Sequence, residues 1–369
     1  MKHLRLTWKE PIPESHLWNA YFQGLRIGVL DIETTGLDHR RNRFILGGLY
    51  DPEEKTFHQI FAESPDKEMR ALALFLSLMD GMDVLVTYNG RQFDLPFLRQ
   101  RAATWGIPFP AALYDLDLYQ VVNGHSPLRR LLPNLRQKTV EDYLGLWTTR
   151  TDEISGAESI QLYERFVRTG DRALAEKILL HNSDDVMQLT RLIPVIGKCD
   201  FHQAMNHMGF PLRPAGRRLL ADRIELVRDE LVIEGGQIDD PAEFHCYELD
   251  GFPLRAEFRA ADGRFSLRVP LIRNSGIAAV DLRASGVDET AFAKYPESGS
   301  GYLVLQDHDR LCCREINHFA CALAERLAPL VYPRADRTER TEAELSGAPS
   351  GAEHTNAELP GAPAPAEDE

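Results

Sequence analysis

The stretch LRIGVLDIETTGLD, residues 25–38, decides the fold and raises the question of function. Its first nine residues alternate in the way that a half-buried β-strand does. Residues two apart in a strand point to the same face, so Asp31 and Glu33 continue the apolar row that begins at Leu25. Two neighbouring carboxylates repel each other, and a cation between them relieves that repulsion. The strand therefore predicts a metal site at its end.

Composition limits the classes of protein to consider. The chain has 369 residues, 43% of them hydrophobic, which is enough for two domains. Its formal net charge of −14 argues against indiscriminate nucleic-acid binding, although a local basic groove is compatible with it. No apolar run approaches the ~20 residues of a membrane span, and no signal peptide is visible. The five cysteines show no C-x-x-C spacing. We therefore expect a cytoplasmic protein with reduced thiols and no membrane contact.

The hydrophobic periodicity divides the chain into parts. We expect an N-terminal extension over 1–24 and an α/β domain over 25–198, in which an antiparallel meander leads into a mixed sheet. Its expected strands are 25–33, 43–51, 55–63, 83–90 and 112–120. The helix after the meander has an apolar face of Leu72, Phe75, Leu76 and Met79. Further helices are expected over 95–105, 126–145, 157–169 and 172–194.

The remainder predicts a small α+β accessory module over 199–333. Its expected elements are a helix over 216–233, a hairpin over 257–272, a strand over 301–306 and a helix over 314–331. No catalytic set of residues is visible in it. The tail over 334–369 has nine acidic residues and three arginines among Ala, Pro, Gly, Ser and Thr, which predicts disorder. A solvating tail is the favoured interpretation, and a partner-binding tail is the alternative.

Two further segments place acidic residues at the ends of predicted elements. In VTYNGRQFDLPFLRQR, Asn89 and Gly90 end a strand and Asp94 precedes a helix. In LLHNSDDVMQL, His181 and Asp185 are i, i+4 neighbours on one helix face, with Cβ atoms about 5–6 Å apart. A base and a carboxylate can therefore serve one site.

The segments DIETTGLD, YNGRQFD and HNSDDV, in this order, resemble the three signature segments of the DEDD exonucleases. This DnaQ-like group has a ribonuclease-H-like fold, a mixed sheet flanked by helices. The longer run from LRQKTVEDYLGL to LLHNSDDVMQL resembles the YprB-type bacterial subgroup. The resemblance covers about residues 25–195.

The resemblance implies a metal-dependent 3′-5′ exonuclease that acts on the end of single-stranded nucleic acid, DNA or RNA. It implies two Mg²⁺ or Mn²⁺ ions on the order of 3.5–4 Å apart, which suits an oxygen-rich site without cysteine. Asp31 would bridge both ions, Glu33 and Asp185 would hold one, and Asp94 the other. His181 would be the general base, since an imidazole ordinarily titrates near pH 6.5.

The resemblance also implies the contacts with substrate. Thr34, Thr35 and Leu37 would lie beside the terminal sugar and base, and Asn89 and Phe93 would line the same pocket. Phe93 could stack on a base or belong to the core, and both interpretations stay open. The basic run HRRNR, residues 39–43, could hold phosphates or form a solvated loop.

One spacing departs from the family. Histidine-type members separate the histidine from the last acid by four residues, whereas here three residues lie between His181 and Asp185. That is the spacing of tyrosine-type members. If Asp184 were the last acid, its separation from His181 would be shorter still, so Asp185 is the expected ligand.

A second class of function fits the same sequence. The chain could be a non-catalytic nucleic-acid-binding or scaffolding protein that retains the exonuclease fold. Loss of any of the four acids would favour that alternative, and all four are present.

Overall fold

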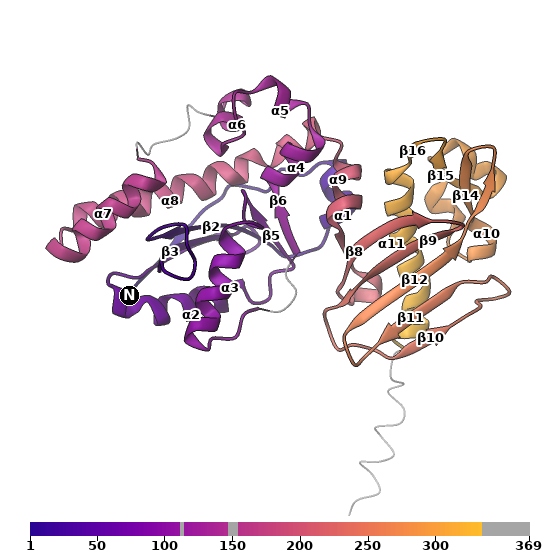
Figure 1. The fold of residues 1–369 in the computed structure, drawn as a ribbon, viewed down its shortest axis with the longest axis horizontal. Helices are drawn as coiled ribbons and strands as arrows, with labels where there is room; N and C mark the ends of the chain where they lie inside the picture. The colour runs from indigo at the N-terminus through magenta and orange to yellow at the C-terminus, as the bar shows by residue number, and fades with distance from the viewer. Residues whose placement is uncertain (111–113, 147–153, 334–369) are drawn as a thin grey trace, which may run out of the picture. The chain divides into compact units, whose positions relative to one another are not determined.

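The first sheet has six strands in the order β1-β4-β3-β2-β5-β6, in a computed structural model that describes residues 1–110, 114–146 and 154–333 (Figure 1). Strands β1 to β4 pair antiparallel, whereas β2 with β5 and β5 with β6 pair parallel. The predicted meander and mixed sheet are therefore confirmed. The strand bounds are β1 Lys2–Thr7, β2 Ile27–Thr34, β3 Phe44–Asp51, β4 Thr56–Phe61, β5 Val84–Thr87 and β6 Tyr114–Asp117.

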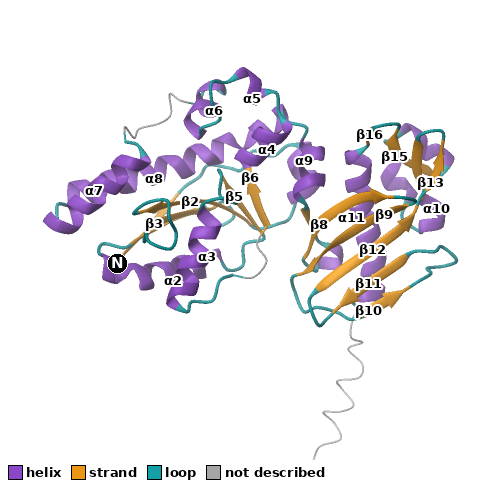
Figure 2. Ribbon diagram, viewed as in Figure 1, coloured by secondary structure: helices purple, strands orange, loops and turns teal. Residues whose placement is uncertain are grey.

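Helices cover both faces of this sheet (Figure 2). They are α1 His16–Phe22, α2 Glu68–Met79, α3 Asp94–Trp105, α4 Leu118–His125, α5 Leu128–Leu131, α6 Gln137–Tyr143, α7 Gly156–Thr169 and α8 Arg172–Leu192. Two adjacent glycines of β3 allow close approach from opposite sides. A Cβ on Gly47 would lie 2.5 Å from Phe75 of α2, and one on Gly48 would lie 2.4 Å from Asn182 of α8.

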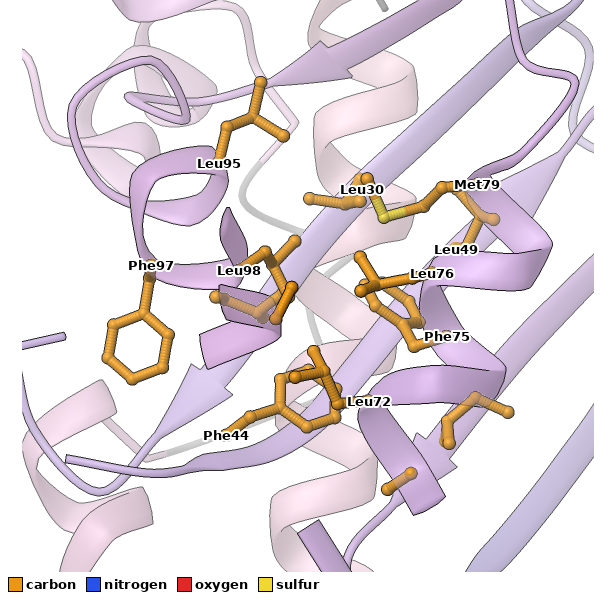
Figure 3. Close-up of a cluster of buried hydrophobic side chains, with 14 of the residues drawn as sticks. Leu30, Phe44, Leu49, Leu72, Phe75, Leu76, Met79, Leu95, Phe97 and Leu98 are labelled. Carbon is orange, nitrogen blue, oxygen red and sulfur yellow. The ribbon is translucent and has the colours of Figure 1, made fainter. Parts of the chain in front are cut away.

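The core on the α2 side confirms the predicted apolar face of that helix. Figure 3 shows Leu72, Phe75, Leu76 and Met79 packed among buried side chains of the sheet and of α3. A second cluster lies where α7 and α8 pack, and it includes Phe61 and Tyr163. The sheet is thus buried on both faces, and every residue of β3 and β4 is buried.

The N-terminal extension contains an edge strand that the sequence did not predict. β1 pairs with β4 along its whole length, and Trp8, just after it, stacks on Phe57 with ring centroids 3.9 Å apart. This extension therefore belongs to the sheet of the following domain.

The segment after α8 is α+β, as predicted. A second six-stranded sheet has the order β10-β11-β12-β9-β8-β7, and a four-stranded sheet has the order β13-β14-β15-β16. The strands are β7 Phe210–Leu212, β8 Leu219–Val227, β9 Glu230–Gln237, β10 Phe244–Cys246, β11 Arg255–Arg259, β12 Arg264–Pro270, β13 Ile272–Asn274, β14 Ile277–Asp281, β15 Tyr302–Asp307 and β16 Arg310–Leu311. The helices are α9 Phe201–Met208, α10 Leu282–Ser285 and α11 Cys313–Val331. The 3-10 helices of the chain are Pro65–Lys67, Ile193–Lys198, Pro214–Gly216, Glu289–Phe292 and Pro296–Ser300.

The helix predicted over 216–233 is wrong. This segment forms the antiparallel hairpin of β8 and β9, which pair from Leu219 with Gln237 to Val227 with Glu230. The register shifts between Ala221 and Arg223, so a bulge interrupts the alternation of β8. The buried residues of that strand, Leu219, Ala221 and Ile224, are consequently two and then three residues apart and do not show the strict alternation of a strand.

The domain boundaries stay predictions. Residues Met1–Val331 form one compact unit, so the boundary expected at residue 198 is not marked by a break in packing. The tail predicted over 334–369 lies outside the described residues. No helix in the described ranges combines the length and apolar character needed to cross a membrane.

Candidate metal and active site

Strand β2 carries the first two acidic residues of the site, Asp31 and Glu33. Asp31 is half-buried opposite Gly48 of β3, and Glu33 is buried two residues further on. Burial raises the pKa of Asp31 well above its usual range, and so do the neighbouring carboxylates of Asp185, Asp94 and Glu33. Burial likewise raises the pKa of Glu33 to about 7, although nearby His181 opposes the shift. The described side chains of the protein therefore balance the negative charge of Asp31 and Glu33 only in part.

Asp94 joins this group as the first residue of α3. The parallel pairing of β2 with β5 ends at Val29 and Val86. Beyond that point the backbone N–H of Ile32 donates to Asp94 Oδ1 at 3.2 Å, between the two acids of β2. The Asp94 side chain is buried, which raises its pKa to about 7. Because Ile32 lies beyond the end of the β2–β5 pairing, its backbone N–H can hold the carboxylate of Asp94 beside Asp31 and Glu33.

Helix α8 supplies the histidine and the fourth acid. The Nε2 atom of His181 lies 3.6 Å from Glu33 Oε1 and 3.5 Å from Asp185 Oδ2. One ligand atom from each of these three residues lies within 4.8 Å of the others, a spacing that can hold a metal ion. Asp184, the neighbour that we did not expect as a ligand, is buried and is not part of this cluster.

Two amide side chains that sequence reasoning missed hold Asp31 in place. Asn182 Nδ2 donates to Asp31 Oδ2 at 2.9 Å and to the Asp31 carbonyl at 3.1 Å. Gln59 of β4 donates in turn to Asn182 Oδ1 at 3.0 Å and to the carbonyl of Leu179 at 2.8 Å. This chain fixes the Asn182 amide so that its NH₂ group faces Asp31. No sequence motif predicts this chain of hydrogen bonds, because it forms only where α8 crosses the sheet.

Strand β6 positions the loop that precedes Asp94. Asp117 accepts from the backbone N–H groups of Asn89 at 2.8 Å and Arg91 at 3.3 Å. Asn89 has a φ of 68°, a left-handed conformation that asparagine tolerates better than most residues. Thr87 donates to the buried Asp115 at 2.6 Å, and burial raises the pKa of Asp115 to about 8. No sequence motif predicted that Asp115 and Asp117 support this loop.

The residues expected to contact substrate lie at the end of β2 and in the loops that follow β2 and β5. Thr34 is buried and donates to the Gly36 carbonyl at 2.8 Å, and the Thr35 hydroxyl accepts from the Arg43 backbone at 2.9 Å. Leu37 is 81% exposed, which is unusual for a leucine and leaves it free to touch a ligand. Phe93 packs against the core near Phe97, with part of its ring exposed.

The basic run after the first acids is solvated in part. Arg40 and Arg41 are exposed, and Arg41 lies 3.5 Å from Asp38. Arg43 donates to the Pro65 carbonyl at 3.2 Å. The phosphate-binding interpretation of this loop stays a prediction.

Known proteins match the part of the chain that carries these residues. Residues 29–196 match the RNase H superfamily. They form a ribonuclease-H-like domain. A protein of Bacillus subtilis (strain 168), named "Uncharacterized protein YprB", is 30% identical over 167 residues, which are 44% of this chain and 40% of the relative. The predicted resemblance to the YprB-type subgroup is thereby confirmed for this domain.

Two solved structures are also similar in part. One is the family B DNA polymerase from Pyrobaculum calidifontis, with a TM-score of 0.36 and 20% identity over 46% of this chain and 24% of the polymerase. The other is an ExoI/SSB-Ct complex, with a TM-score of 0.27 and 14% identity over 59% of this chain and 57% of that one. The ribonuclease-H-like domain thus spans less than half of YprB and a quarter of the polymerase chain.

Proposed function

We propose that the chain is a metal-dependent exonuclease that removes nucleotides from the 3′ end of single-stranded nucleic acid. One observation carries the proposal. Glu33 of β2 and Asp185 of α8 lie within 3.6 Å of His181, and Asp31 of β2 and Asp94 of α3 are near enough to these carboxylates to interact with them electrostatically, in a ribonuclease-H-like domain.

The donor set fits divalent cations. The carboxylates of Asp185 and Asp94 help to raise the pKa of both Asp31 and Glu33, as expected of acids that face each other around a cation site. The four carboxylates offer oxygen ligands, which the hard ions Mg²⁺ and Mn²⁺ prefer. We propose that Asp31 contacts two ions, that Glu33 and Asp185 hold one, and that Asp94 holds the other.

Bound divalent ions would lower the pKa of an attacking water and offset the charge that develops at the phosphorus. The protein's own groups do the rest. His181 Nε2, 3.6 Å from Glu33 Oε1 and 3.5 Å from Asp185 Oδ2, would accept the proton of the attacking water, and the two carboxylates would stabilise the imidazolium that forms. Asn182 and Gln59 keep the Asp31 carboxylate from rotating.

The same proposal assigns the recognition of the strand end. Thr34, Thr35 and Leu37 would contact the terminal sugar and base, and Asn89 and Phe93 would line the opposite side. The partial exposure of Phe93 and the exposure of Leu37 support these contacts. Telling DNA from RNA depends on contacts to the 2′-hydroxyl.

The test is a 5′-labelled single strand, DNA and RNA in parallel, incubated with Mg²⁺, Mn²⁺ or a chelator. We expect a metal-dependent ladder of shortened labelled products, whereas digestion from the 5′ end would release the label as a mononucleotide at once. Asp31→Asn should abolish the ladder, because the amide lacks the charge that binds the ions. Asp240→Asn removes the same charge from an exposed position that the proposal does not involve, and it should leave the ladder unchanged.

Two results would contradict the proposal. Strands that stay intact under every metal condition would favour the non-catalytic nucleic-acid-binding alternative. An Asp31→Asn protein as active as the parent would exclude the two-metal assignment.

We also propose a cytoplasmic location. All five cysteines fall in the described ranges and are free thiols, which agrees with a reducing compartment.

A further inference from the structure

A cavity bounded in part by cationic side chains shares no residue with the acidic site. It has a volume of about 650 Å³ and is bounded by α1, by His202 of α9, by the segment Lys294–Tyr295 and by the first turns of α11. That volume falls in the range of small-molecule sites, about 300–1,000 Å³.

The charged residues around this cavity have one sign. Lys294, Arg314, His202 and His318 line it, and none of the lining residues whose side chains are described is an aspartate or glutamate, although the chain carries a net charge of −14. Among the side chains that the structure describes, neither Lys294 nor Arg314 forms an ion pair, whereas most arginines of the neighbouring sheets do. The cations instead lie over the ring of Tyr295, each 5.3 Å from its centroid.

Electrostatics within the cavity indicate a missing counter-charge. Burial and the cations Lys294 and Arg314 lower the pKa of His318 to about 4. Burial and Arg314 lower the pKa of Lys294, and Glu315, which does not line the cavity, opposes this only in part. Like charges are therefore held together at a cost that an anion would relieve.

A hydrogen-bond network holds the wall of the cavity in shape. Tyr21 OH and His202 Nδ1 are 2.6 Å apart, and Asn317 Nδ2 donates to both the Tyr21 hydroxyl and the His202 carbonyl at 2.9 Å. Tyr295 OH similarly lies 3.2 Å from His318 Nδ1. Each histidine thus has Nδ1 engaged, and Nε2 has no hydrogen-bond partner in the part of the chain that the structure describes.

We propose that this cavity binds a phosphate-bearing small molecule of nucleotide size. Arginine, lysine and histidine donors together suit a phosphate, since charge-assisted bonds to phosphate oxygens are the stronger kind. A phosphate alone would fill only a small part of the volume. The proposal does not depend on nuclease activity, because the cavity contains none of the proposed metal ligands.

The experiment uses the full chain carrying Asp31→Asn, in the presence of a chelator, so that the acidic site cannot bind phosphate through metals. Calorimetric titrations use adenosine 5′-monophosphate, inorganic phosphate and adenosine as probes. We expect the nucleotide to bind more tightly than phosphate, and adenosine not to bind. Arg314→Gln and Lys294→Gln should each weaken nucleotide binding about tenfold or more, the cost of one charge-assisted bond.

The matched control is Arg310→Gln, which removes an exposed arginine of β16 that lies outside the cavity. It should leave the affinity unchanged. No nucleotide binding at millimolar concentration, equal binding by parent and both cavity variants, or adenosine binding as tightly as the nucleotide would each overturn the proposal. Phosphate binding as tightly as the nucleotide would overturn the assigned size of the ligand.

Discussion

At the scale of single residues, the position of His181 allows two roles. Its Nε2 lies between Glu33 and Asp185, where it can take a proton from water or serve as a third ligand of a cation. The two roles differ in what the loss of the ring would change. A base affects the rate of the chemical step, whereas a ligand affects metal affinity as well.

We expect His181→Ala to lower the single-turnover rate by about 10²–10⁴-fold, as the loss of a general base does, with little change in Mn²⁺ affinity. His181→Tyr should restore part of the rate, because the spacing to Asp185 is that of tyrosine-type exonucleases. Rates at saturating Mn²⁺ and a Mn²⁺ titration of each form separate the two roles. His245→Ala, at an exposed histidine, is the control. A large fall in Mn²⁺ affinity in His181→Ala would identify the ring as a ligand instead.

Asp115 provides a pH test that does not involve the proposed ligands. Its pKa in the folded chain is about 8, above the ordinary value, so it takes up a proton on folding at neutral pH. The unfolded chain releases this proton near pH 4, whereas the folded chain keeps it up to about pH 8. The free energy of unfolding therefore falls as pH rises from about 4 towards 8, by at most about 1.4 kcal/mol per pH unit.

Asp115→Asn removes this titration and keeps the shape of the side chain. The variant should resemble the parent near pH 5 and be more stable by a few kcal/mol, roughly, near pH 8. Urea denaturation of both proteins at pH 5, 6.5 and 8 measures the difference, and the titrations of other groups cancel in it. A difference that stays constant with pH would show that Asp115 is ionised throughout.

At the scale of elements, the approach of α8 to the sheet sets the site. Gly48→Ala would place a Cβ 2.4 Å from Asn182 Oδ1, and the helix would have to move away. We expect the free energy of unfolding to fall by about 1–3 kcal/mol, as for other overpacked sites. Strand cleavage should fall with it, because Asn182 would lose its hydrogen bond to Asp31.

Gly197→Ala is the matched control, since a Cβ there meets open space. It should change the unfolding free energy by less than about 1 kcal/mol. Urea midpoints and cleavage rates of the three proteins check the prediction. Equal stability and activity of Gly48→Ala and the parent would mean that α8 can shift away from β3 without loss of stability or of the site.

Sequence patterns predict what is local and miss what forms across elements. The strand ending in Asp31 and Glu33, and the helix bearing His181 and Asp185, are regular patterns, so both were predicted. Asn182 and Gln59 escaped prediction because their partners are 151 and 123 residues away in sequence. The β8–β9 hairpin was missed because a bulge breaks its alternation and its turn, at Arg228, has no glycine.

At the scale of the whole molecule, one buried amide ties distant segments together. Asn317 of α11 is 2% exposed, donates to Tyr21 of α1 and to the His202 carbonyl, and accepts from Asn206 at 3.0 Å. Tyr21 and Asn317 are 296 residues apart in the sequence. The first and last helices of the described chain therefore share one polar network.

Asn317→Ala should lower the free energy of unfolding by about 2–4 kcal/mol, because the Asn206 amide and the Tyr21 hydroxyl would lose a buried partner. Since residues Met1–Val331 form one compact unit, we expect parent and variant to unfold in a single transition whose urea midpoint shifts. Asn274→Ala, at an exposed asparagine of β13, should shift it by less than about 0.5 kcal/mol. Tryptophan fluorescence follows the ribonuclease-H-like part, because all four tryptophans precede residue 150, and circular dichroism follows the whole chain. If the fluorescence midpoint of Asn317→Ala stays at the parent value while the circular dichroism midpoint falls, the two parts unfold independently and the network does not couple them.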